Sequence, residues 1–153
     1  MFTNQGWKAL AIGTNAAQQF PESMRVQSLR MGAPADSFNT LLLNFTGFER
    51  PLQTARLLVE SNSALVIQGS ALEVLSTPTD GSTGNLALGG SINHGDYSQV
   101  EVNGGLSVGR FGQGAYFFTN GTLSAGGEFV GAPSLEIFFN TAGSISLWAT
   151  IID

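Results

Sequence analysis

The chain has 153 residues, with 20 glycines, no cysteine, only 11% charged residues and a net charge of −5. This length fits a single domain with its own core, and the missing cysteines exclude disulfides and thiolate metal sites. The six Lys and Arg residues are scattered, which disfavours nucleic-acid binding. No apolar run reaches ~18 residues, so no membrane-spanning helix is predicted, and the first residues lack the pattern of a signal peptide.

A short unit recurs along the chain: Leu, any residue, an aliphatic residue and then usually Gly. Its copies, two of them degenerate, lie at 10–13, 29–32, 57–60, 86–89, 106–109 and 128–131. Successive copies start 19, 28, 29, 20 and 22 residues apart. These are the lengths expected for one turn of a β-solenoid.

The first elements are expected in the N-terminal part of the chain. Residues 1–9 are expected to form a cap or an arm. Residues 14–25 contain either a short helical turn beside Pro21 or a loop. Residues 26–32 alternate between two faces, and residues 40–46 form a nearly continuous apolar run, which is typical of a buried strand.

The clearest strand pattern lies in residues 54–75. Three short alternating segments are separated there by corners at 62–63 and 69–70. Three strands with such short connections fit one coil of a solenoid better than a set of hairpins. The polar segments 76–85 and 91–99 are expected to be exposed loops.

From Val100 onward, alternation defines an inner and an outer face. Residues 114–121 are echoed by residues 135–142 with an offset of 21 residues. This offset predicts that Phe117 stacks on Phe138, about 4.8 Å away in the next coil. Phe117 and Phe138 would then lie on the outer face, whereas Tyr116 and Phe118 would point inward.

Frequent Gly and Asn residues in the last third of the chain argue against helices there. The sequence therefore predicts one all-β domain over residues 1–153. The expected fold is a short parallel β-solenoid, or β-helix, of about five to seven coils, with capping irregularities at the N-terminus. The alternative is an antiparallel β-sandwich or jelly roll.

The segment LSVGRFGQGAYFFTNGTLSAGGEFVG, residues 106–131, resembles the β-helical repeats of bacterial autotransporter-type and PEP-CTERM-associated proteins. Those repeats read as Val-Gly, a few residues, Gly, an alternating apolar strand and Asn-Gly-Gly. The resemblance covers about residues 86–147, although Thr122 stands where the second Gly is expected and Glu128 replaces an apolar residue. It implies a secreted or surface-anchored bacterial protein whose repeats act as stalks, adhesins or matrix components, and it brings no catalytic residues.

Two loops contain side chains that could bind a metal ion. His94 and Asp96 could also offer a base and a carboxylate, but a single loop histidine is interpreted as polar surface. The segment Asp80–Asn85 has oxygen ligands suited to Ca²⁺, yet it lacks the final Glu of an EF-hand loop and is interpreted as a turn. The sequence thus predicts no metal site and no cofactor.

Paired carboxylates are the remaining catalytic candidates. Glu101, Glu128 and Glu136 lie on different predicted coils and could share a face, as glycoside hydrolysis requires. Acidic residues on the outside of a solenoid are usually solvated, so no catalytic residue is predicted.

The candidate binding residues are the outward aromatics. Phe117 and Phe138, together with Trp148, could form a flat platform for sugar rings or for a neighbouring subunit.

The leading functional hypothesis is a non-catalytic structural or adhesive module, located outside the cell or on the bacterial surface. The ends of a solenoid expose strand edges that can stack on another copy, which gives head-to-tail filaments. The apolar segment 146–153 is the expected contact. A carbohydrate-binding module is the alternative, and a polysaccharide-degrading enzyme is a third hypothesis, so the expected partners are further copies of the chain or surface glycans.

Overall fold

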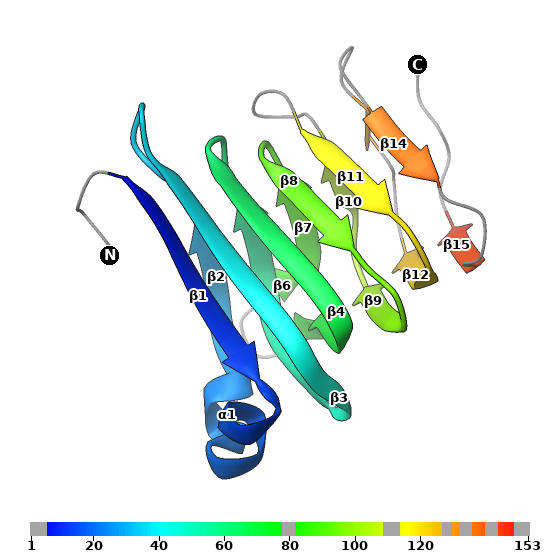
Figure 1. Cartoon of the computed structure of the whole chain (residues 1–153). Coiled ribbons are helices and arrows are strands. Elements are labelled where there is room, and N and C mark those ends of the chain that lie inside the picture. Colours follow the sequence, from blue (N-terminus) through cyan, green and yellow to red (C-terminus); the bar gives the residue numbers. More distant parts are fainter. Residues whose placement is uncertain are drawn as a thin grey trace.

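The chain winds into a tube of stacked parallel strands (Figure 1). The computed structural model describes residues 6–77, 82–108 and 114–126, together with the backbone of strands at 130–131, 136–139 and 144–148. Every pairing within its large sheet is parallel. The prediction of a parallel β-solenoid is therefore confirmed, and the antiparallel alternative is wrong.

The strands form three ladders, one for each side of the tube. The first ladder contains β1 (Trp7–Gly13), the early parts of β3 (Phe38–Val59) and β4 (Ser63–Val74), β8 (Ser91–His94), β11 (Ala115–Phe118) and β14 (Glu136–Phe139). The second contains later parts of β3 and β4, then β9 (Ser98–Val102), β12 (Gly121–Gly126) and β15 (Ser144–Trp148). The third contains β2 (Arg25–Met31), the end of β3, β7 (Asn85–Leu88), β10 (Leu106–Val108) and β13 (Val130–Gly131).

The solenoid makes about four turns. These are the laps that pass through all three ladders. The first lap has helices in place of a strand on the second ladder, and the last lap has no third-ladder strand in the part of the chain that the structure describes. The expected five to seven coils therefore exceed the number of complete turns, since the first and last laps each lack a described strand on one ladder.

Of the two alternatives for residues 14–25, the structure contains the helical one. Helix α1 (Thr14–Gln19) is followed by the short 3₁₀ helix η1 (Pro21–Met24), which begins at the proline. A first helical position suits proline, since its N–H would have no partner there. Ala17 and Met24 are buried in the core. Neither described helix is long and apolar enough to cross a membrane.

The remainder of the expected N-terminal cap is only partly described. Residues 7–9 belong to β1, the outermost strand of the first ladder, rather than to a separate arm. Residues 1–5 lie outside the described part of the chain.

Each lap lies in register on the previous one, so equivalent positions form columns along the tube. One inner column contains, in order of stacking, Ile12, Leu43, Ile67, His94 and Phe118. From Leu43 onward, all of these side chains are buried. Such columns bury apolar area along the whole length of the tube, and this burial is the main stabilising contribution.

The two expected loops differ from prediction. Residues 91–99 contain strand β8, a corner and the start of β9, with the side chains of Ile92 and His94 buried. Residues 76–85 contain a small antiparallel hairpin of β5 (Ser76–Thr77) and β6 (Ser82–Thr83), after which β7 begins. Residues 78–81 lie outside the described part.

Candidate functional site

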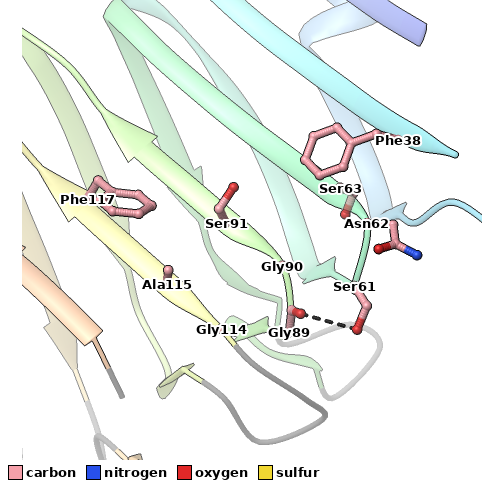
Figure 2. Close-up of a pocket in the computed structure, with 10 residues that line it drawn as sticks. All are labelled: Phe38, Ser61, Asn62, Ser63, Gly89, Gly90, Ser91, Gly114, Ala115 and Phe117. Atoms are coloured by element: carbon pink, nitrogen blue, oxygen red, sulfur yellow. Dashed lines mark hydrogen bonds between the residues drawn. The ribbon is translucent and has the colours of Figure 1, made fainter. Parts of the chain in front are cut away.

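An open groove of about 640 Å³ lies on the outer surface of the first ladder, at the corner where the third ladder leads into it (Figure 2). Its lining residues come from laps two to five and are Phe38, Ser61, Asn62, Ser63, Gly89, Gly90, Ser91, Gly114, Ala115 and Phe117. None of these side chains carries a charge.

Small residues keep the groove open. Ser63, Gly90 and Gly114 occupy equivalent positions on successive laps. Each immediately precedes a residue that pairs with the neighbouring strand of the first ladder. A Cβ atom on Gly90 would lie 2.3 Å from the backbone oxygen of Glu60. No side chain fits there, so the corner is closely packed against the previous lap.

Two phenylalanines stand at opposite ends of the groove. Phe38 begins β3 and Phe117 lies in β11, and Figure 2 shows Ser91 between them. The Phe38 ring meets the exposed Trp7 ring edge to face, with ring centres 5.7 Å apart. The Phe117 side chain is 36% exposed.

Polar groups with unused hydrogen-bonding capacity also line the groove. Within the described residues, the Ser91 hydroxyl has no hydrogen-bond partner. Asn62 donates only a long bond, 3.4 Å from its side-chain nitrogen to the Pro34 oxygen. Ser61 donates an equally long bond to the Gly89 oxygen. The groove therefore combines aromatic faces with accessible hydroxyl and amide groups.

The predicted aromatic platform is only partly assembled. Phe117 pairs with Phe138 across adjacent strands, as the 21-residue offset predicts. Trp148 lies in β15 opposite Gly126, on the second ladder, so its backbone belongs to another side of the tube. The structure thus brings the two phenylalanines together but not the tryptophan.

The sequence interpretation missed Phe38 and Trp7. The recurring Leu–aliphatic–Gly unit follows the third ladder, except that its copy at 10–13 lies in β1 of the first. Trp7 pairs with Phe38, 31 residues later in the chain. No two successive copies of the recurring unit have this spacing. The apolar run at 40–46 could have indicated Phe38, because both belong to strand β3.

The interpretation of His94 as polar surface is wrong, because its side chain is fully buried. Its Nε2 lies 3.0 Å from the Ser98 backbone oxygen, and its Nδ1 lies 3.0 Å from the Tyr116 hydroxyl. A carbonyl oxygen only accepts, so Nε2 carries the hydrogen and Nδ1 of the neutral ring accepts from Tyr116. Burial lowers the pKa of His94, opposed by its backbone hydrogen bond to Ser98, and burial raises the pKa of Tyr116.

The histidine does not form the base and carboxylate pair considered from the sequence. Asp96 contributes its backbone oxygen, which accepts a hydrogen bond from the Ser98 hydroxyl. Gly121 lies close to the Nε2 edge of the ring, where an added Cβ atom would lie 2.7 Å from Nε2 and 2.2 Å from the Ser98 oxygen. The buried ring therefore joins neighbouring laps and does not face an open site.

The acidic candidates are not gathered into one site. Glu101 lies on the second ladder next to Glu73, whereas Glu136 lies on the first ladder. Glu128 and Asp80 lie outside the described residues. In the described part of the chain, no group of three potential metal ligands occurs.

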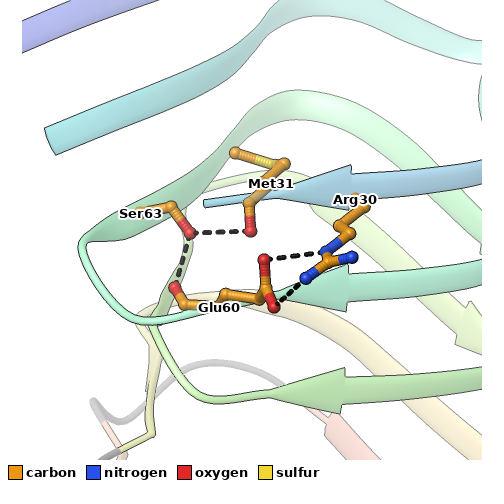
Figure 3. Close-up of polar contacts among 4 residues, drawn as sticks. All are labelled: Arg30, Met31, Glu60 and Ser63. Atoms are coloured by element: carbon orange, nitrogen blue, oxygen red, sulfur yellow. Dashed lines mark hydrogen bonds and ion pairs between the residues drawn. The ribbon is translucent and has the colours of Figure 1, made fainter. Parts of the chain in front are cut away.

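An ion pair on the third ladder links laps one and two (Figure 3). Arg30 donates from Nε and Nη2 to the Glu60 carboxylate at 2.8 and 2.7 Å. The hydrogen bond from Arg30 lowers the pKa of Glu60. The Ser63 hydroxyl lies 2.6 Å from the Glu60 backbone oxygen and 3.3 Å from that of Met31. These bonds hold a corner together, although a solvent-exposed ion pair of this kind contributes little to the stability of the fold.

No family model, no curated protein and no solved structure matches the chain. Its function is therefore inferred from the residues and geometry described above.

Proposed function

We propose that this chain is a non-catalytic structural module that assembles head to tail, one copy stacking on the end of another. The observation that carries this proposal is the exposure of Leu10. Its side chain is 51% exposed, whereas Leu41 and Leu65, next in the same column, are 7% and 0% exposed. This position is buried in laps two to five and open in the first, because no coil covers the first lap.

Strand edges at both ends support stacking. Among the described residues, β1 and β2 pair only with β3, while β14 pairs only with β11 and β15 only with β12. Their outer edges leave backbone N–H and C=O groups available to another strand. Since the ladders are parallel throughout, β14 of one copy would continue onto β1 of the next in the same direction.

The helices at the N-terminal end cover only part of it. Helix α1 and η1 occupy the place of a second-ladder strand and bury Ala17 and Met24. Val26 of β2, like Leu10 of β1, remains exposed. The first and third ladders therefore keep an apolar, unpaired end, which favours association over solubility as a single copy.

A location outside the cell is part of the proposal. It is supported by the resemblance to surface-protein repeats and by a composition in which small polar residues, rather than charged ones, provide most of the solvation. An adhesive role would add a ligand-binding surface to such a fibre.

The test is a charge placed on the open end. Wild-type protein should form linear oligomers whose mass rises with concentration in sedimentation and whose length is visible by electron microscopy. Leu10→Lys should weaken association at least about tenfold, since stacking would bury an unpaired ammonium group.

The matched control is Tyr97→Lys, which adds the same charge at an exposed corner on the side of the tube. It should assemble as the wild type does. A wild type that stays monomeric at millimolar concentration, or a folded Leu10→Lys that assembles normally, would contradict the proposal.

A further inference from the structure

We infer that the groove between Phe38 and Phe117 binds a neutral oligosaccharide that lies obliquely across the strands. This inference goes beyond the structural role and depends on other residues, because the groove lies on the side of the tube and not at its ends.

The absence of charge in the lining selects the ligand class. None of the ten lining residues is charged, in a chain whose net charge is −5. A phosphorylated or carboxylated ligand would find no cation there, and desolvating its charge without a partner would be costly. A ligand with many hydroxyl groups and no net charge does not incur this desolvation cost.

The two rings suit the apolar faces of sugar units. The C–H groups on one face of a pyranose can pack on an aromatic ring while its hydroxyls point away, and aromatic side chains with partial exposure are suited to such contacts. Trp7, which contacts Phe38 edge to face, extends the aromatic surface toward the first lap.

The distance between the rings sets the size of the ligand. Phe38 and Phe117 are separated by three laps and by four positions along the strand. With about 4.8 Å between strands and about 3.3 Å per residue, the Cα atoms lie roughly 20 Å apart. A chain of three or four sugar units spans this length.

Polar side chains that line the groove can orient the bound sugar chain. The Ser91 hydroxyl projects outward between the two rings (Figure 2), and the Asn62 amide lies at the rim. Both can exchange hydrogen bonds with sugar hydroxyls. Because Ser91, Ala115 and Phe117 stand on paired strands, the site is preformed, which lowers the entropic cost of binding.

The experiment is a titration followed by NMR and calorimetry, performed on dilute Leu10→Lys protein so that end-to-end stacking is reduced. The probes are cellotetraose, maltotetraose and xylotetraose, with tetragalacturonate as the charged comparison. At least one neutral probe should shift the amide signals of Ser91 and Ala115. Phe38→Ala and Phe117→Ala should each weaken that binding by about tenfold.

Two further variants keep the inference falsifiable if a phenylalanine variant does not fold. Ser91→Leu fills the groove from an outward position and should abolish binding, whereas Phe48→Ala removes an exposed phenylalanine outside the groove and should not change it. The inference is overturned if no neutral probe binds at millimolar concentration. It is also overturned if the charged probe binds as well, or if Phe48→Ala weakens binding equally.

Discussion

His94 is a polar side chain within an apolar column, stacked between Ile67 and Phe118. Its ring meets the Phe118 ring edge to face, with centres 4.7 Å apart. Both ring nitrogens are hydrogen-bonded, one to the same lap and one to Tyr116 in the next. A buried imidazole in this position stabilises the fold only while it is neutral, since protonation would replace an acceptor by a donor facing a hydroxyl and place a charge in the core.

Acidification should therefore destabilise the protein through His94. Burial holds the pKa of His94 below its ordinary value of 6.5, so the unfolded chain binds a proton before the folded chain does as pH falls. The histidine contribution to stability is complete above pH ~6.5 and decreases as pH falls toward the folded-state pKa.

Urea unfolding at about pH 7.5 and about pH 5.5 measures this loss. The matched variant is His94→Gln, which keeps a donor and an acceptor but does not titrate. It should be less stable than the wild type at neutral pH and should lose less stability on acidification. Identical losses in the two proteins would show that His94 is not responsible.

At the scale of the elements, the corners between strands restrict the sequence more tightly than the strands do. At the corner before β8, the chain passes so close to the previous lap that Gly90 donates its backbone N–H to the Val59 oxygen at 3.0 Å. A strand position tolerates any side chain of suitable size and polarity, whereas this corner tolerates no side chain.

Gly90→Ala should consequently destabilise the protein strongly. The added Cβ would lie 2.3 and 2.4 Å from the backbone oxygens of Glu60 and Ser63, which are held by the register of two laps. We expect a loss of about 2 kcal/mol or more in the free energy of unfolding.

The control for this substitution is Gly13→Ala at the end of β1, where the added Cβ would lie 3.8 Å from the Asn44 oxygen. It should change stability by less than about 1 kcal/mol. Urea unfolding of both variants checks the difference, and equal effects would contradict the close approach at Gly90.

The sequence predicted those elements whose signal is repeated within the chain. The third-ladder unit and the 21-residue offset led to the fold and to the pairing of Phe117 with Phe138. Strand β8 was missed because Ile92 is its only apolar residue, and four residues are too few to display alternation. His94 was misjudged for a related reason: its partner Tyr116 lies 22 residues away on the next lap.

At the scale of the whole molecule, stability depends on position along the tube. A lap in the middle is paired on both sides, whereas the first lap is paired only with the second among the described residues. In such a quasi-one-dimensional fold, opening starts most easily at an end.

Amide hydrogen exchange should show this gradient. In dilute protein, backbone amides of Trp7–Gly13 should exchange faster than those of Ser63–Val74, because half of the groups in β1 face an open edge. Raising the concentration should slow exchange in β1 and leave β4 unchanged if copies stack at this end. Uniform exchange in the two segments would contradict a gradient.

The laps share one register although they differ in length. Along one inner column of the first ladder, successive residues are 31, 24, 27, 24 and 21 positions apart in the chain, so surplus residues are taken up at the bends. A coding sequence could therefore gain or lose one internal segment, and the protein would grow or shrink by about 4.8 Å while both termini kept their chemistry. The length of such a molecule is therefore encoded in its sequence and changes in steps of one strand spacing.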